Sequence, residues 1–186
     1  MGLKYSKTTA DYLVWSDAMN LIRNLAKDGN YKISLLVAIG CFTGLRISDI
    51  LALRWRQILN TEEFTIIEKK TGKTKKFPLN DKLKTLIAKV VKNRRDREPL
   101  FKSHWGRRYN RITAYYMIRN ACAAVGLEEK IGTHSMRKTF GYHHYQQFKD
   151  IAILQKIFNH SSQQITMRYI GIEQDQIDYS YNNFIL

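Results

Sequence analysis

The sequence predicts an α+β fold that is mainly α, a compact helical domain with one small antiparallel β-hairpin. Apolar residues recur at helical spacing along most of the chain, and one stretch alternates on both sides of a glycine turn. The 186 residues contain only two prolines, and we find no internal repeat, low-complexity tract or linker. With 44% hydrophobic residues the chain can bury one core, so we expect a single domain over 1–186.

The first third of the chain predicts three helical segments. Ser16 can cap a helix over 17–27, whose apolar positions follow a helical period. The stretch 33–42 is almost entirely apolar, which indicates a buried central helix. It ends close to Gly44, a residue that permits a tight turn. A further helical segment follows over 47–53.

The middle of the chain predicts the hairpin. Residues 64–68 and 75–79 have strand-like composition and are separated by the turn residues 71–73. An amphipathic helix over 83–91 follows, with Asn80 at its start.

The second half of the chain is predicted to be helical. In the helix expected over 111–125, Ile112, Ile118 and Val125 belong to one apolar face. Further helices are expected at 134–147, 151–158, 162–169 and 174–184.

The charge balance favours a polyanionic partner. Lysine and arginine outnumber aspartate and glutamate by 31 to 16, which gives a formal charge of +15. Nucleic acid is the leading candidate, because the sequence lacks both an 18-residue apolar run and a basic amphipathic helix with a free apolar face for a membrane. Cys41 and Cys122 lie in apolar helical segments, so we expect buried reduced thiols and a cytoplasmic protein.

Two arginine segments carry the first functional signal. Arg46 follows a turn glycine and precedes a helix, so its guanidinium can point into a cleft, although for this segment taken alone a surface ion pair is the better explanation. His134 and Arg137 are three residues apart on a predicted helix and can reach one ligand together. A cap and a surface charge are the alternative for this pair.

Three further residues complete the pattern. Lys70 lies at the hairpin tip, where an ammonium group can donate a proton or remain solvated. His160 precedes a serine pair suited to capping a helix, and Tyr169 lies at the end of that helix. The last two also have ordinary explanations. His160 could bond a helix end, and Tyr169 could be an aromatic residue of the core.

Taken in order, these segments resemble the tyrosine recombinase, or phage integrase, family from about residue 5 to residue 172. Two departures from the family pattern are Lys138, where a histidine is common, and Asn159, which replaces a glycine. The matching pieces are Thr43-Gly-Leu-Arg46-Ile-Ser-Asp49, Lys70-Thr-Gly-Lys73 ahead of Phe77-Pro-Leu79, His134-Ser-Met-Arg137, and His160 followed nine residues later by Tyr169.

The resemblance implies a recombinase catalytic-domain fold and a role for each matched residue. Arg46, Arg137 and His160 are expected to bind the oxygens of the scissile phosphate. Tyr169 is expected to attack phosphorus and to form a transient 3′-phosphotyrosyl bond.

Three matched residues would assist this reaction. Lys70 is expected to protonate the leaving oxygen, His134 to assist proton transfer at the tyrosine, and Asp49 to orient the catalytic group. Because the phosphotyrosine conserves bond energy, the resemblance implies no cofactor, no ATP and no metal.

The resemblance also implies double-stranded DNA as the partner and self-association in a tetrameric synapse on DNA, without a membrane or a small-molecule substrate. The expected setting is a bacterial cytoplasm, in association with the nucleoid. Six further basic residues are candidate DNA contacts, or simply a solvated basic surface: Lys69, Lys73, Lys75, Arg107, Arg108 and Arg111.

The two ends of the chain raise separate expectations. Family members carry an N-terminal helical DNA-binding domain, and little sequence precedes the first helix here, so we expect the catalytic half of a longer protein. The apolar tail over 173–186 is expected to contact a neighbouring protomer or to pack on its own domain.

Two other functions compete with the recombinase at this point. A type IB topoisomerase shares the chemistry but relaxes DNA without synapsis, and a catalytically silent DNA-binding or architectural protein could retain the scaffold. A metal site at His143 and His144 is disfavoured, because adjacent helical residues point apart and no suitably spaced carboxylate or cysteine accompanies them.

Overall fold

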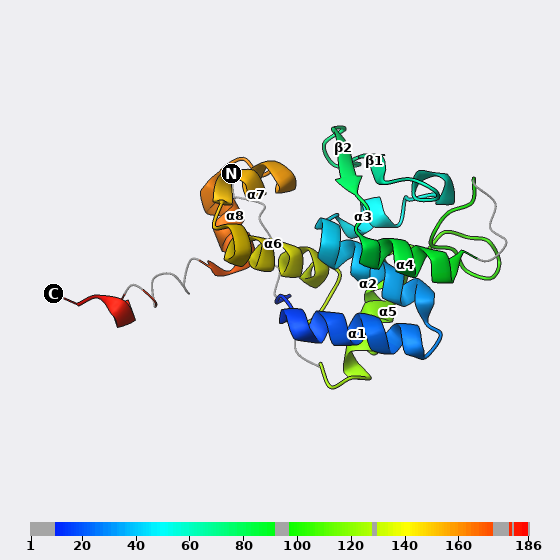
Figure 1. Cartoon of the computed structure of the whole chain (residues 1–186), viewed down its shortest axis with the longest axis horizontal. Helices are drawn as coiled ribbons and strands as arrows, with labels where there is room; N and C mark the ends of the chain where they lie inside the picture. The colour runs from blue at the N-terminus through cyan, green and yellow to red at the C-terminus, as the bar shows by residue number, and fades with distance from the viewer. Residues whose placement is uncertain (1–9, 92–96, 128–129, 173–178, 180, 186) are drawn as a thin grey trace.

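The computed structural model describes residues 10–91, 97–127, 130–172, 179 and 181–185. Within them the chain is mainly helical with one two-stranded sheet, as the sequence predicts (Figure 1). No described helix has the length and apolar character needed to cross a membrane. The elements are α1 (Trp15–Lys27), α2 (Tyr31–Thr43), α3 (Ile47–Ile50), the 3-10 turn η1 (Trp55–Gln57), β1 (Glu63–Ile67), β2 (Thr74–Pro78), α4 (Asp81–Val90), α5 (Arg111–Ala123), α6 (Ser135–Phe148), α7 (Ile151–Phe158) and α8 (Gln163–Ile170).

The hairpin confirms the alternation read from the sequence. β1 and β2 pair antiparallel with Phe64 opposite Phe77, and both strands begin one residue earlier than expected. Phe64 and Ile66 are buried on the inner face. Glu68, the next residue on that face, follows the strand and is also buried, with 1% of its surface exposed.

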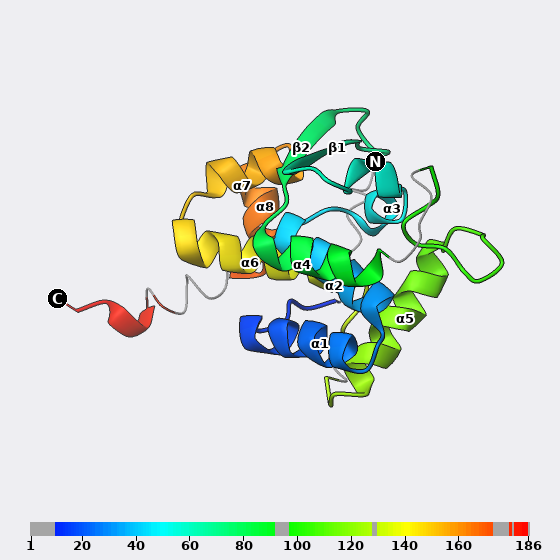
Figure 2. The same cartoon turned by 45° about the vertical axis from the view of Figure 1, so that its right-hand side comes forward.

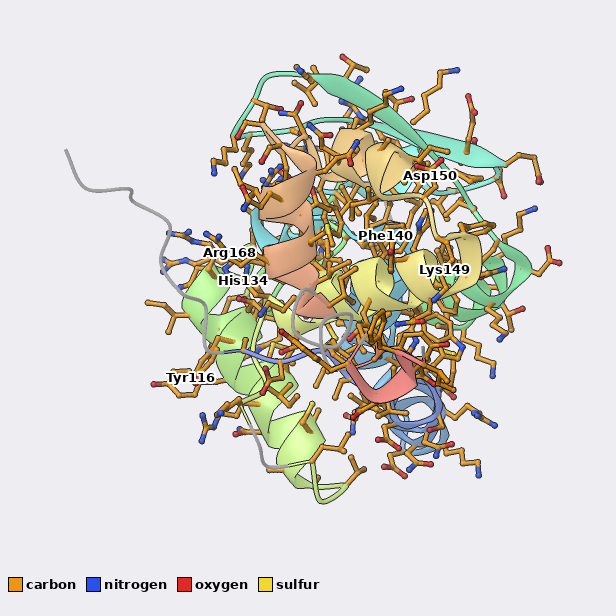
Figure 3. All side chains as sticks on the ribbon, turned by 90° about the vertical axis from the view of Figure 1, so that its left-hand side faces the viewer. Tyr116, His134, Phe140, Lys149, Asp150 and Arg168 are labelled. Carbon is orange, nitrogen blue, oxygen red and sulfur yellow. The ribbon has the colours of Figure 1, made fainter. Side chains whose placement is uncertain are left out.

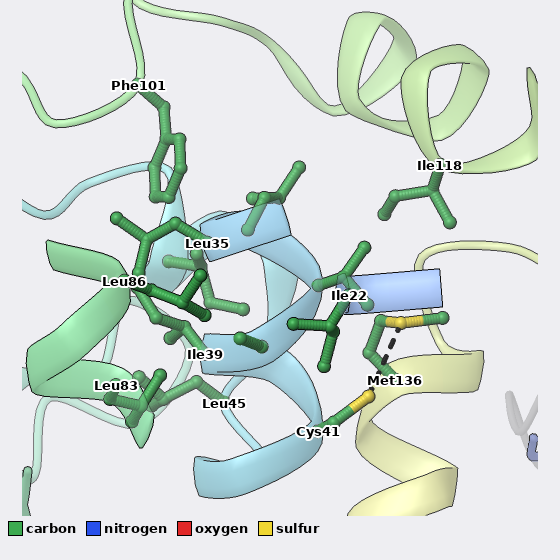
Figure 4. Close-up of a cluster of buried hydrophobic side chains, with 14 of the residues drawn as sticks. Ile22, Leu35, Ile39, Cys41, Leu45, Leu83, Leu86, Phe101, Ile118 and Met136 are labelled. Atoms are coloured by element: carbon green, nitrogen blue, oxygen red, sulfur yellow. Dashed lines mark hydrogen bonds between the residues drawn. The ribbon is translucent and has the colours of Figure 1, made fainter. Parts of the chain in front are cut away.

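The main core surrounds α2, the nearly all-apolar helix. It packs against α1, α4 and α6, and Leu35 and Ile39 are almost completely buried (Figure 4). Cys41 contacts Met136 of α6, with 3.6 Å between the sulfur atoms. Cys41 and Cys122 are both buried free thiols, which confirms that expectation.

A second, smaller cluster lies beneath α7 and α8. Leu154, Phe158, Ile170 and Ile172 are its buried members, and Phe140 of α6 packs against them. Figure 2 shows α7 and α8 at the end of α6, away from α1 and α5. The segment that carries Tyr169 therefore belongs to this small cluster and not to the main core.

Two N-terminal helix boundaries differ from the sequence prediction. The first helix begins at Trp15, so Ser16 lies inside it and does not cap it; Val14 takes the cap position without a side-chain hydrogen bond. The segment expected over 47–53 is helical only to Ile50. The chain after Ile50 pairs with a distant segment instead, because the carbonyl of Leu53 accepts a hydrogen bond of 2.9 Å from the amide of Leu100.

The expected apolar face of α5 is partly wrong. Ile112 and Val125 are 68% and 39% exposed, and the helix ends at Ala123. Ile118 and Cys122 are buried as expected, and the rest of the buried side consists of Ala114 and Ala121. Small side chains allow the helix to approach its neighbours closely, a preference that a search for large apolar residues misses.

The remaining C-terminal helices lie close to their expected positions. Ser162 caps α8, where its side chain accepts a hydrogen bond of 3.2 Å from Ile165, and Asn80 caps α4 in the same way. The helix expected over 134–147 begins at Ser135, so His134 is its N-cap residue. Most of the helix expected over 174–184 lies outside the described residues.

Candidate active site

Arg46 is held at a turn between two helices. Gly44 ends α2 in the left-handed conformation with a φ of 63°, and Arg46 follows in extended geometry as the N-cap of α3. A Cβ atom at Gly44 would come within 2.5 Å of Phe140, so only glycine fits here. The turn predicted from the sequence therefore lies between α2 and α3 and carries Arg46 at the start of α3.

Arg137 enters the same place from the first turn of α6. It is 4% exposed and donates hydrogen bonds to the carbonyls of Gly44 and Phe158. Its guanidinium carbon lies 4.1 Å from the centre of the Phe158 ring. Burial lowers the pKa of Arg137 to about 10, which leaves it charged at neutral pH.

The C-terminal end of α7 joins the two arginines. The carbonyl oxygen of Phe158 accepts a hydrogen bond from Arg46 Nη2 at 3.3 Å and from Arg137 Nη2 at 3.0 Å. The last carbonyls of a helix lack partners within the helix and carry partial negative charge. Two cations from distant parts of the chain are therefore aligned on one oxygen atom.

Lys70 lies in the loop between β1 and β2, as predicted, and is exposed. Asp49 anchors this loop, since its Oδ1 accepts a hydrogen bond of 3.0 Å from the amide of Lys69. A cleft of about 640 Å³ opens between the loop, α3, α5 and the start of α6. Its lining includes Arg46, Lys69, Lys70, Arg111, Tyr116, His134 and Arg137.

Figure 3 places Tyr116 of α5 and His134 along one edge of the molecule, at this cleft. Tyr116 is 57% exposed and is accompanied in the lining by the exposed Ile112. The cleft is therefore lined by basic side chains and by exposed apolar and aromatic ones.

Two residues of the site were not identified from the sequence. Glu68 Oε1 accepts hydrogen bonds from Arg46 at 2.9 Å and from Lys75 at 3.2 Å, and Lys75 also donates to the carbonyl of Ile157. We expected Lys75 only as a possible surface DNA contact, but it is half-buried beside the arginines. The sequence signal that could have found Glu68 is its position, since it continues the alternation of buried residues set by Phe64 and Ile66.

The environment of the two histidines favours their neutral forms. Burial, together with the charges of Arg137 and Arg46, lowers the pKa of His160 to about 4. Burial and Arg137 also lower the pKa of His134. His160 Nδ1 lies 3.1 Å from the hydroxyl oxygen of Thr166, which fixes the ring toward α8.

Tyr169 lies near the end of α8 and turns its ring inward. The ring meets those of Phe158 and His160 edge to face, with centroids 5.5 Å and 5.3 Å apart. Its hydroxyl oxygen is buried, beside the guanidinium of Arg137. Burial raises the pKa of Tyr169, against the opposing charges of Arg137 and Arg46, so the free protein holds a neutral phenol.

The remaining predicted residues do not join the cluster. Arg107 and Arg108 are exposed on the loop before α5 and are absent from the cleft lining. Lys73 instead donates a hydrogen bond of 2.8 Å to the side chain of Asn159. Within the described ranges, no group of three or more histidine, cysteine or acidic side chains is placed to hold a metal ion, and His143 bonds the carbonyl of Leu13.

Comparison with known sequences places this arrangement among relatives. The model of the phage integrase family matches residues 14–175. A probable integrase/recombinase, YoeC of Bacillus subtilis, is 49% identical over 150 residues, which are 80% of this chain and 82% of the relative. The tyrosine recombinase XerD of Staphylococcus saprophyticus is 25% identical over 97% of this chain, and the match spans 64% of that relative.

Solved structures show the same fold. The XerA recombinase superposes with a TM-score of 0.75 at 21% identity, over 94% of this chain and 66% of that one. The catalytic domain of bacteriophage HP1 integrase gives a TM-score of 0.60 at 22% identity, over 94% and 95% of the two chains. The XerH site-specific recombinase in its post-cleavage complex with difH gives 0.71 at 20% identity, over 98% and 55%.

Proposed function

The chain belongs to the phage integrase family, and on that premise we propose that it is a site-specific DNA recombinase or integrase domain. It would cleave and rejoin DNA through a 3′-phosphotyrosyl intermediate during integration or excision of mobile DNA. The observation that carries this proposal is the convergence of Arg46 and Arg137 on one carbonyl oxygen beside a buried tyrosine.

The scissile phosphate would bind where the two arginines meet. Its non-bridging oxygens would accept hydrogen bonds from the N–H groups of the arginines that the Phe158 carbonyl does not occupy, and they carry more negative charge than that carbonyl. His160 is neutral in the free protein because burial and the nearby cations lower its pKa, and an approaching phosphate would raise this pKa and favour a hydrogen bond to it. These donors are fixed before the substrate arrives, which is the condition for effective stabilisation of the transition state.

Cleavage would form a bond between Tyr169 Oη and phosphorus and break the bond from phosphorus to the 5′ oxygen. The phenol has to lose its proton, which His134 would accept as a neutral imidazole. The electron pair of the broken bond stays on the 5′ oxygen, and Lys70 would supply the proton that neutralises it. Reversal of these steps rejoins a strand, and the phosphotyrosine stores the energy for it.

The cleft is the natural path for the duplex next to the scissile phosphate. Lys69 and Arg111 line it, and Lys73, Lys75, Arg107 and Arg108 would add contacts or long-range attraction to phosphates. Such contacts position DNA without reading its sequence. DNA affinity should therefore fall steeply as salt concentration rises.

Self-association on DNA is part of the proposal. Relatives of known structure include recombinases bound to DNA, among them XerH with difH. The C-terminal segment would contact a neighbouring protomer in a tetrameric synapse, and four of its apolar side chains are more than two-thirds exposed. These are Tyr179, Tyr181, Phe184 and Ile185. We propose a nucleoid-associated protein of the bacterial cytoplasm.

A covalent capture experiment tests the function and finds the DNA site together. The protein is incubated with nicked duplexes whose central segment is randomised, and complexes that survive denaturant are recovered and sequenced. Wild-type protein should enrich a defined sequence, and Tyr169→Phe should bind DNA with no covalent product. Bound DNA without a covalent product in the wild type would instead indicate a silent DNA-binding protein.

A second assay separates recombination from relaxation. A recombinase should exchange strands between two duplexes that carry the recovered sequence. A topoisomerase-like enzyme would relax a supercoiled plasmid that carries no such sequence.

A further inference from the structure

Glu68 places a buried negative charge inside a site built to bind a phosphate. Its side chain is 1% exposed, and its carboxylate contacts Arg46, Lys75 and Thr71. Burial alone would raise the pKa of Glu68, but the Thr71 hydrogen bond and the charges of Lys75 and Arg46 outweigh it and lower the pKa. The group is therefore an anion at neutral pH, although an anion here opposes the charge of the DNA.

We propose that Glu68 is a positioning residue for DNA cleavage, which fixes the guanidinium of Arg46 in the orientation that receives the scissile phosphate. This inference rests on the proposed function. Glu68 holds Arg46 Nη1 at 2.9 Å while the carbonyl of Phe158 holds Nη2 at 3.3 Å. A guanidinium carries five N–H donors, so two anchored contacts set its plane and leave the other donors for phosphate.

The same carboxylate joins Arg46 to the loop of Lys70. Its second oxygen, Oε2, accepts a hydrogen bond of 2.7 Å from the hydroxyl of Thr71. The main-chain carbonyl of Glu68 also accepts hydrogen bonds from the amides of Thr71 at 3.3 Å and Gly72 at 2.8 Å. Glu68 thus closes the loop from both its backbone and its side chain.

Charge balance is the competing role for this residue. Arg46, Arg137 and Lys75 are crowded together, and a carboxylate among them relieves repulsion whatever its geometry. A charge-balancing glutamate should matter for folding and little for the chemical step. A positioning glutamate should matter for the chemical step, because a misplacement of about 1 Å can cost about 100-fold in rate.

Three variants separate these roles. Glu68→Gln keeps the shape of the side chain and removes its charge, and Glu68→Asp keeps the charge but shortens its reach to Arg46. Glu63→Gln is the matched control, because Glu63 lies on the same hairpin, changes the net charge equally and pairs with Lys76 in an exposed position. Melting and circular dichroism establish that each variant is folded.

The measurement is the single-turnover rate of covalent complex formation at saturating DNA, on the sequence recovered by capture. We expect both Glu68 variants to be about 10- to 100-fold slower than wild type, and Glu63→Gln to remain within about twofold. DNA affinity should be no weaker for Glu68→Gln than for Glu63→Gln. Equal rates for Glu68→Gln and Glu63→Gln, or Glu68 variants that do not fold at the assay temperature, would overturn the proposal.

A substrate with a bridging 5′ sulfur shows which partner Glu68 acts through. A thiolate leaves without needing a proton, so this substrate should restore the rate of Lys70→Ala and leave Glu68→Gln slow. Full restoration of Glu68→Gln would mean that Glu68 acts on the Lys70 loop and not on Arg46, contrary to the proposal. A wild-type protein that forms no covalent complex would count against the proposed function and not against this assignment.

Discussion

The main core and the small cluster beneath α7 and α8 are built for different tasks. The main core surrounds α2 and encloses large side chains such as Trp55 and Phe101 from many elements. Among the described residues the small cluster has four buried members; Tyr169 packs against it, and the ring of His160 contacts that of Phe158. Local stability depends on such apolar burial, so the segment with the proposed nucleophile should open at a lower free-energy cost than the scaffold that carries the arginines.

The seam between these regions is where the site forms. Phe158 belongs to the small cluster, yet its carbonyl binds Arg46 and its ring lies against Arg137. Arg46 and Arg137 hold the end of α7 at this seam, and in the proposed function they also bind the substrate. Variants in either region can test whether the main core and the small cluster differ in this way.

The largest effect is expected from Arg137→Ala. The variant removes a preorganised donor to the phosphate, and loss of one such donor typically costs about 100- to 1000-fold in rate. Single-turnover covalent complex formation measures it. Arg23→Ala on α1, where the side chain bonds its own helix, is the control and should retain the wild-type rate. Similar rates for the two variants would remove Arg137 from the proposed chemistry.

Two helical glycines probe the two regions with the same added methyl group. A Cβ at Gly40 would come within 2.6 Å of Met136 in the main core, and a Cβ at Gly141 within 2.6 Å of Ile170 in the small cluster. Gly40→Ala should lower the free energy of unfolding by about 1–3 kcal/mol through overpacking. Gly141→Ala should instead increase amide exchange in α8 and reduce covalent complex formation.

Denaturant unfolding and hydrogen exchange read out this pair. The comparison fails if Gly141→Ala destabilises the whole domain as much as Gly40→Ala while exchange in α8 stays unchanged. In that case the two clusters would unfold as one unit.

Acid should weaken the small cluster through His160. Its pKa falls from 6.5 to about 4 on folding, so the unfolded chain binds more protons between these values. The contribution of neutral His160 to the free energy of unfolding is therefore fully present above pH 6.5 and is lost as the pH falls toward 4. His160→Gln should flatten the dependence of the melting temperature on pH over this window. A profile that is identical in wild type and variant would contradict the assignment.

The smallest effect is expected from Asn159→Gly. Asn159 adopts a left-handed conformation with a φ of 53° and holds Lys73 of the hairpin at 2.8 Å. Glycine suits this backbone and loses only an exposed hydrogen bond, so the cleavage rate should change by about twofold or less. Asn60→Gly, at a φ of 51° away from α7, is the matched control. If the cleavage rate falls tenfold or more in Asn159→Gly but not in Asn60→Gly, the hydrogen bond between Asn159 and Lys73 has a larger role.

The sequence predicted those parts of the fold that depend on local pattern. Asn80 and Ser162 cap their helices because a short polar side chain can bond the amide three residues on. Ser16 has the same chemistry but lies inside α1, since tertiary packing extended that helix by two residues. The segment after Ile50 was misjudged for a similar reason, because its partner near Leu100 is distant in the chain.

The site divides in the same way. Gly44 and the spacing of His134 and Arg137 are local signals that left ordinary explanations open, and the order of the matching segments in the family resemblance singled out Arg46 and Arg137. Glu68 and the carbonyl of Phe158 could not be identified so directly, because their importance arises only when α7 and the hairpin meet. A carbonyl oxygen has no sequence signature at all.

Identification of the residue joined to DNA tests the central claim most directly. Captured complexes are digested with protease and nuclease, and the modified peptide is located by mass spectrometry. We predict a nucleotide 3′-phosphate on Tyr169 and no adduct in Tyr169→Phe. An adduct on another residue, or an undiminished adduct in Tyr169→Phe, would contradict the account.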